Sequence, residues 1–232
     1  MKRGIVTIHI VPPASVRPEH LPLSREERDR AASFRFEKDA AHWARTRGAL
    51  RVILGNSLGI SPSEVPIRTT AMGKPYLASP FGHLHFNLSH CEDLALVALS
   101  PDGPLGIDLE SSSRASSLLE CRETFCHPEE LAEIGAGDPA AQARTLLELW
   151  TAKEALLKAL GTGFSHPPEQ IRILSTADAG GIRNARSDSP LPGVDQWQIR
   201  PLVHAALAGH VAMIAMSRSV EQLIIIPTPA ST

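Results

Sequence analysis

Two acidic residues alternate along a short apolar segment near the middle of the chain. Asp108 and Glu110 belong to residues 106–110, which read GIDLE. Successive side chains on a strand face opposite sides, so both acids would share one face and leave Ile107 and Leu109 on the other. Carboxylates ~7 Å apart along a strand repel each other unless a positive charge lies between them. The pair therefore indicates a site for a hard divalent cation such as Mg²⁺, with a phosphate substrate completing its oxygen shell; a solvated acidic face on an edge strand is the alternative.

A second candidate lies in residues 150–164, which read WTAKEALLKALGTGF. Helical spacing places Glu154 on one stripe with Trp150 and Lys158. Lys158 follows Glu154 by four residues, the favourable orientation for an ion pair. An acid beside a tryptophan is unusual for a solvated face, although an ion pair on a surface helix is the alternative. Lys153 points about a quarter-turn away and need not share the site.

A third set of residues could bind phosphate. Lys74 lies in the turn sequence GKP and would present a fixed cation. Ser89 and His90 end the predicted strand FNLSH and offer donors to the same kind of ligand. Cations for phosphates, acids for a metal, and a helix that carries an acid and a lysine together indicate magnesium-dependent phosphoryl-type transfer. Positioning and charge neutralisation supply most of the catalysis in such reactions.

Other chemistries have weaker support in the sequence. Two groups hold zinc-ligand residue types without a common ligand spacing, namely His83, His85 and His90 in one and Cys121, Cys126 and His127 in the other. No GxSxG sequence surrounds Ser89, so a serine hydrolase is disfavoured. The chain also lacks a Walker loop and a dinucleotide-binding GxGxxG.

The elements expected to position these residues follow one order twice. Ser24 and Glu27 form a capping-box sequence that predicts a charged helix, and a second helix is expected over residues 39–54 with Gly55 and Asn56 as its stop. A short helix opened by Pro128 and a long one at 140–160 follow. Loops are expected at 111–117 and 177–193. Strands are expected at 4–11, 65–69, 83–89, 94–100, 105–110, 171–174, 197–203, 211–216 and 223–226.

This order favours an α+β fold made of two similar halves. Strands cluster rather than alternating strictly with helices, which argues against a doubly wound α/β sheet. The order strand, helices, strands begins at residue 1 and again at residue 105, so we expect halves at residues 1–104 and 105–232. No repeat of individual residues accompanies this order.

Composition excludes several classes of protein. The 232 residues are 43% hydrophobic and 21% charged, as in ordinary globular proteins. A net charge of −2 provides no basic field for nucleic acid or membranes. Three cysteines without a CxxC fit a reducing cytosol. No apolar run approaches the ~20 residues of a membrane helix, and the first 13 residues are too interrupted for a signal peptide, so a cytoplasmic location is expected.

With these motifs in place, the sequence resembles the Sfp-type 4′-phosphopantetheinyl transferases, which load carrier proteins with the coenzyme A arm. The family signatures GIDxE and WxxKEAxxKxxG stand at residues 106–110 and 150–161. GKP and FNLSH match in the right order upstream, as does a run of the form FxxEKDAxxxxxxRxxLR from Phe34 to Arg51. The resemblance covers about residues 20 to 216.

The resemblance implies a fold, a reaction and roles for named residues. The fold would be a pseudo-dimer of two α+β halves with the active site in the cleft between them, in a monomeric protein. Magnesium-dependent transfer of 4′-phosphopantetheine from coenzyme A to a serine of an apo acyl or peptidyl carrier would release adenosine 3′,5′-bisphosphate. The implied residues are Asp108, Glu110 and Glu154 for magnesium; Arg47, Lys74, Ser89 and His90 for the 3′-phosphate end of coenzyme A; Asp108 and Lys158 for its pyrophosphate region; and Glu154 and Lys158 for catalysis.

Two departures and two rival functions accompany the resemblance. Cys91 and Glu92 stand where the family usually has a small residue and then glycine, and Leu146 stands where an aromatic residue is common. A coenzyme A-binding module without turnover and a magnesium-dependent phosphohydrolase of small nucleotides are the alternative functions. The carrier could belong to fatty acid, polyketide, non-ribosomal peptide or lysine metabolism.

Overall fold

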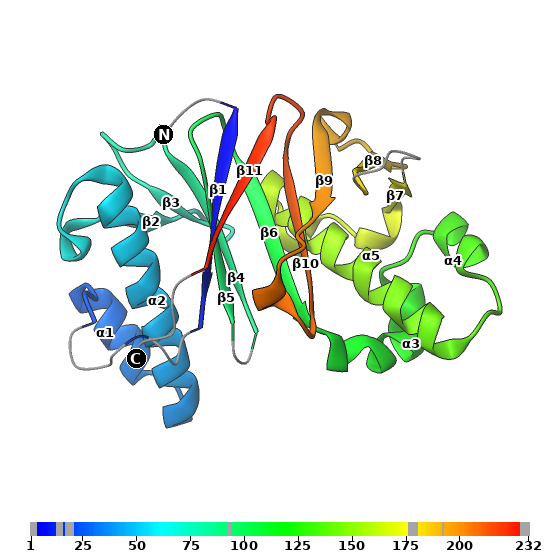
Figure 1. The fold of residues 1–232 in the computed structure, drawn as a ribbon, viewed down its shortest axis with the longest axis horizontal. Coiled ribbons are helices and arrows are strands. Elements are labelled where there is room, and N and C mark those ends of the chain that lie inside the picture. Colours follow the sequence, from blue (N-terminus) through cyan, green and yellow to red (C-terminus); the bar gives the residue numbers. More distant parts are fainter. Residues whose placement is uncertain are drawn as a thin grey trace.

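A computed structural model of the chain describes residues 4–12, 16, 21–91, 94–175, 181–191 and 193–227. Two sheets stand side by side at the centre, with a long helix outside each of them (Figure 1). This arrangement of mixed helix and sheet confirms the expected α+β class. No helix within the described ranges is long and apolar enough to cross a membrane.

The first sheet has the strand order β11-β1-β5-β4 and is flanked by the helices of the N-terminal part. Strand β1 pairs antiparallel with β5, which pairs antiparallel with β4, while β11 lies parallel to β1. The elements of this part are β1 (Ile5–Val11), α1 (Arg25–Ala32), α2 (Glu37–Leu58), β2 (Ile67–Thr69), β3 (Pro75–Leu77), β4 (His85–His90) and β5 (Ala95–Ser100), with β11 (Gln222–Pro227) from the far end of the sequence.

The second sheet has the order β6-β10-β9-β8-β7 and packs against α5. Its elements are β6 (Leu105–Ser111), α3 (Leu118–Cys121), α4 (Pro128–Ile134), α5 (Pro139–Leu160), β7 (Ile171–Ser175), β8 (Arg183–Ser187), β9 (Trp197–Pro201) and β10 (His210–Ser217). The order β6-β10-β9 repeats β1-β5-β4, and a 22-residue helix follows the first strand of each set, α2 in one and α5 in the other.

Successive side chains of each strand face opposite sides of its sheet, so the apolar core has three layers. One lies between α2 and the first sheet, one between the two sheets, and one between the second sheet and α5. In β10, Ile214 and Met216 face the first sheet, whereas Met213 and Ala215 face α5. In β5, Val97 lies in the cluster with α2, and its neighbours in the strand lie between the sheets. The molecule is therefore layered helix, sheet, sheet, helix, and the face of β6 that carries the acids looks toward α5.

Side chains of β4 join the two sheets where their edges meet. The backbone N–H of Ile107 donates to Asn87 Oδ1 at 2.9 Å, and that of Leu109 donates to Ser89 Oγ at 3.2 Å. Strands β4 and β6 share no ladder, so these side chains satisfy amides of β6 that would otherwise be buried without partners. The FNLSH segment thus has a structural role that its sequence did not indicate.

Gly106 allows α5 to approach β6. A Cβ atom at this position would lie 2.0 Å from the Ala155 carbonyl oxygen and 2.3 Å from the Ala159 amide nitrogen. Both are backbone atoms, so they can move away only if the helix itself shifts. The glycine of GIDLE is therefore required by the packing of the helix that carries Glu154 and Lys158.

Replacing Gly106 with alanine is expected to destabilise the fold by about 3 kcal/mol, the upper end of the usual cost of overpacking, because backbone must shift. Urea unfolding measures the loss. Gly137→Ala is the control, since a Cβ there meets nothing within 4 Å. Equal stability of the two variants would contradict the close approach.

Several expected boundaries were wrong. Helix α2 continues through Gly55 and ends at Leu58, where Gly59 adopts a φ of 70°. Gly55 serves packing instead, because a Cβ there would lie 2.9 Å from the Ile60 carbonyl oxygen. The expected loop at 111–117 contains a 3₁₀ helix, Ser112–Ser117, and the expected loop at 177–193 contains β8. Residues 177–180 and 192 of that loop lie outside the described residues.

Candidate active site

Asp108 is the most enclosed acid of the candidate site. Its side chain is only 6% exposed, and its Oδ1 accepts hydrogen bonds from Lys158 Nζ at 2.7 Å and Ser89 Oγ at 3.0 Å. Its Oδ2 is buried and has no hydrogen-bond partner among the described residues. A buried carboxylate oxygen without a partner is costly, which marks this atom as a candidate ligand.

Ser89 and Lys158 complete the surroundings of Asp108. The Ser89 hydroxyl donates to Asp108 and accepts from the Leu109 amide and from Lys158 Nζ, at 3.0 Å for the lysine. These three bonds use the whole hydrogen-bonding capacity of a hydroxyl. Ser89 therefore orients Asp108 and Lys158, and its contact with a nucleotide stays a prediction.

Trp150 and Arg114 hold Glu110, two residues farther along β6. The Trp150 indole N–H donates to Glu110 Oε1 at 2.9 Å, and Arg114 forms an ion pair with the same oxygen. The Arg114 guanidinium also lies 5.2 Å from the centre of the Trp150 ring. Burial raises the pKa of Glu110, the Trp150 hydrogen bond opposes that shift, and the charge of Asp108 adds to it.

Glu154 lies on α5 within the electrostatic reach of both other acids. Burial raises the pKa of its carboxyl to about 7, with a further upward contribution from Asp108 and an opposing one from Lys158. No described residue forms a hydrogen bond with this carboxylate. Glu154 therefore combines an available carboxylate with a pKa near neutrality, which suits a proton acceptor.

The three acids of the candidate site are the residues expected to hold a metal ion. No three His, Cys, Asp or Glu side chains in the described part of the chain, these acids included, converge closely enough to form a metal site. The donor set nevertheless fits a hard cation, because Asp108 Oδ2 lacks a partner and burial and mutual repulsion raise the pKa of Glu110 and Glu154. A divalent cation would satisfy the oxygen and offset the repulsion.

One cavity brings most of the predicted residues together. A cavity of about 500 Å³ is lined by Ser89, His90, Asp108, Glu110, Arg114 and Lys158. His90 Nδ1 lies 3.1 Å from His42 Nε2, and burial, followed by the charges of His42 and Lys158, lowers the pKa of His90. Cys91 also lines the cavity, whereas Glu92 is outside the described residues.

Two predicted nucleotide contacts are engaged elsewhere. Arg47 Nε pairs with Glu27 Oε1 at 2.5 Å, and Arg51 pairs with the other oxygen of the same carboxylate. Lys74 lines a neighbouring pocket of about 230 Å³, but its ammonium contacts backbone carbonyls. The structure therefore does not bring Arg47 and Lys74 into the cavity lined by Asp108 and Glu110, and Glu154 is not among the residues that line it either.

Lys153 has a structural role that the sequence did not predict. It is 1% exposed, and its Nζ donates to Glu130 Oε2 at 2.6 Å and to the carbonyls of Phe125 at 2.7 Å and Pro168 at 3.1 Å. The other Glu130 oxygen accepts from the Ile173 amide at 2.7 Å. This buried pair ties α5 to α4 and β7 directly beside Glu154. The HPEE sequence that starts α4 was the available signal for Glu130.

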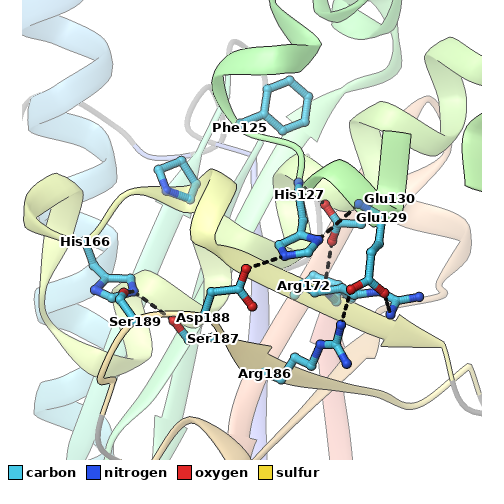
Figure 2. Close-up of polar contacts among 12 residues, drawn as sticks. Phe125, His127, Glu129, Glu130, His166, Arg172, Arg186, Ser187, Asp188 and Ser189 are labelled. Atoms are coloured by element: carbon cyan, nitrogen blue, oxygen red, sulfur yellow. Dashed lines mark hydrogen bonds and ion pairs between the residues drawn. The ribbon is translucent and has the colours of Figure 1, made fainter. Parts of the chain in front are cut away.

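The N-terminus of α4 is fixed by a further polar cluster (Figure 2). His127 Nε2 lies 2.9 Å from Asp188 Oδ2, and its Nδ1 accepts the Glu129 amide at 3.1 Å. Glu129 in turn forms ion pairs with Arg172 on β7 and Arg186 on β8. His127 thus caps the helix and contacts the residue that follows β8, while Cys126 is buried in the core.

Comparison with known proteins agrees with the motifs on β6 and α5. The model of the 4′-phosphopantetheinyl transferase superfamily matches residues 104–209, and that of the 4′-phosphopantetheinyl transferase N-terminal region matches residues 19–102. Among solved structures, holo-ACP-synthase from Plasmodium yoelii has a TM-score of 0.39 and 19% identity, over 49% of this chain and 92% of that one.

Curated relatives carry related names. The 4′-phosphopantetheinyl transferase HetI of a Nostoc species is 36% identical over 66% of this chain and 65% of its own length. A phosphopantetheinyl transferase of a Thraustochytrium species is 34% identical over 61% of this chain and 53% of its own. The chain thus spans between about half and two thirds of these relatives. From the two family models and the signatures that they cover, the chain belongs to the 4′-phosphopantetheinyl transferase superfamily.

Proposed function

We propose that the protein transfers the 4′-phosphopantetheine arm of coenzyme A to a serine hydroxyl of an apo carrier protein. The observation that carries this proposal is the cavity in which Lys158 lies against Asp108, whose second oxygen is buried without a partner. The Lys158 ammonium could pair with a pyrophosphate, and the Asp108 oxygen could bind a divalent cation that accompanies it. The names of the relatives support the same chemistry.

The reaction exchanges one phosphorus–oxygen bond for another. The serine oxygen attacks the phosphorus nearer the pantetheine, and the bond from that phosphorus to the oxygen shared with the adenosine phosphate breaks. Adenosine 3′,5′-bisphosphate takes the electron pair of the broken bond. Glu154, directly or through a water, accepts the serine proton, and Lys158 stabilises charge on the departing phosphate.

Magnesium is part of the proposal. Asp108, Glu110 and Glu154 would hold it, and it would supply charge neutralisation at the pyrophosphate. Trp150 and Arg114 keep Glu110 in place, and Ser89 does so for Asp108. We place coenzyme A along the cavity with Ser89 and His90 toward its 3′-phosphate, in a monomeric cytoplasmic protein.

Intact mass spectrometry of an apo acyl carrier protein, incubated with the protein, coenzyme A and magnesium, tests the proposal. We expect the carrier to gain one phosphopantetheine group, and a carrier whose acceptor serine is alanine to gain nothing. Unchanged carrier mass with consumption of coenzyme A would favour a phosphohydrolase. Unchanged mass with bound, intact coenzyme A would favour a binding module without turnover.

A further inference from the structure

Lys74 extends from a tightly held turn in the N-terminal part of the chain. Gly73 adopts a φ of 85°, and its N–H donates to the Thr70 carbonyl at 2.9 Å. The Thr70 N–H donates to the Lys74 carbonyl at 2.9 Å, and Lys74 N–H donates to Thr70 Oγ1 at 3.1 Å. The backbone from which the side chain extends is therefore fixed.

The ammonium of Lys74 reaches the other part of the molecule. Nζ lies 2.5 Å from the Lys158 carbonyl oxygen, 3.0 Å from that of Ala159 and 3.4 Å from that of Leu105. The first two carbonyls belong to the last turn of α5, where carbonyls lack partners within the helix. A cation at a helix C-terminus is also favoured by the helix dipole. The three N–H donors of the ammonium therefore match three carbonyl acceptors.

These contacts hold Lys158 at both ends. Its carbonyl accepts from Lys74, while its own ammonium contacts Asp108 Oδ1 at 2.7 Å and Ser89 Oγ at 3.0 Å. The third carbonyl belongs to Leu105, the first residue of the strand that carries Asp108. A single side chain thus joins the end of α5 to the start of β6.

We propose that Lys74 is a positioning residue: its ammonium fixes the last turn of α5 against β6, so that the Lys158 side chain is directed onto Asp108. This inference rests on the proposed transfer and replaces the expected contact between Lys74 and the 3′-phosphate of coenzyme A. Burial lowers the pKa of Lys74 to about 8, as befits an ammonium withdrawn from water and surrounded by neutral carbonyls.

The positioning role of Lys74 and a contact between Lys74 and the 3′-phosphate predict different results with 3′-dephospho-coenzyme A. Lys74→Met removes the ammonium and keeps most of the length of the side chain. We expect it to lower kcat roughly tenfold or more with both substrates, with the ratio of their KM values unchanged. A rise in KM for coenzyme A alone, or an unchanged kcat, would overturn the proposal. Arg68→Met, which removes an exposed cation from β2 of the same hairpin, is the matched control.

Amide hydrogen exchange tests the same idea without turnover. The peptide that covers residues 156–161 should exchange faster in Lys74→Met than in the wild type or Arg68→Met, and unchanged exchange would refute the inference. Lys74→Arg keeps cationic donors and should restore most of kcat. If Lys74→Met does not fold, the ratio of the KM values for coenzyme A and 3′-dephospho-coenzyme A in Lys74→Arg decides. If the wild type fails to modify the carrier, the proposed function is wrong, yet the exchange result still decides the role of Lys74.

Discussion

Replacing Glu154 with glutamine is expected to lower the single-turnover rate of transfer about 10²–10⁴-fold, the usual contribution of a general base. Glutamine keeps the size of the side chain and one carbonyl oxygen, but it cannot accept a proton as a carboxylate does. The carboxyl pKa of about 7 means that a large fraction of Glu154 is ionised at neutral pH. Coenzyme A affinity with magnesium should change far less, because Asp108, Glu110 and Lys158 remain.

Calorimetric binding of coenzyme A beside single-turnover transfer separates the two roles of Glu154. Glu148→Gln is the control on the same helix, since Glu148 pairs with Arg183 and Arg144 away from the cavity. Binding that collapses together with the rate would make Glu154 mainly a metal ligand. Retention of both would show that this part of α5 does not take part in the reaction.

Replacing Lys153 with methionine should destabilise the fold by about 3–5 kcal/mol, the usual cost of removing one partner of a buried ion pair. Glu130 is 2% exposed and would lose the cation that pairs with it. The carbonyls of Phe125 and Pro168 would also lose their donor. Denaturant unfolding followed by circular dichroism measures the change.

The double variant Lys153→Met with Glu130→Gln sharpens this test. Because it removes the uncompensated charge, it should be more stable than Lys153→Met alone, and the double-mutant cycle then gives the coupling energy. A single-variant loss below about 1 kcal/mol would mean that the pair contributes no more than an exposed one.

Local patterns in the sequence predicted the elements that depend on neighbouring residues. The Ser24–Glu27 capping box forms as expected, because both partners lie within one turn. The alternation in GIDLE correctly placed Asp108 and Glu110 on one face of a strand. Helix α2 was predicted too short because Gly55 looks like a stop in sequence, and only its close contact with the carbonyl of Ile60 reveals its packing role.

The partners of the charged side chains depended on tertiary structure. The resemblance implied that Arg47 contacts the 3′-phosphate end of coenzyme A, yet Glu27 reaches it from α1. Lys74 finds its acceptors in α5, more than 80 positions away in the chain. Local spacing cannot specify the contacts of Lys74, since they depend on which backbone carbonyls the fold leaves without partners.

The pairing of β11 with β1 has a consequence for how the chain folds. Ile5 lies opposite Gln222 and Ile8 opposite Ile225, so the two ends of the described chain are neighbours in one sheet (Figure 1). Pairings of such sequence separation carry a large loop-closure entropy and slow folding. During ribosomal synthesis, β1 must wait for β11 before that edge of its sheet is covered. The exposed edge of β1 is therefore the place where chaperone binding or mispairing would compete with folding on the ribosome.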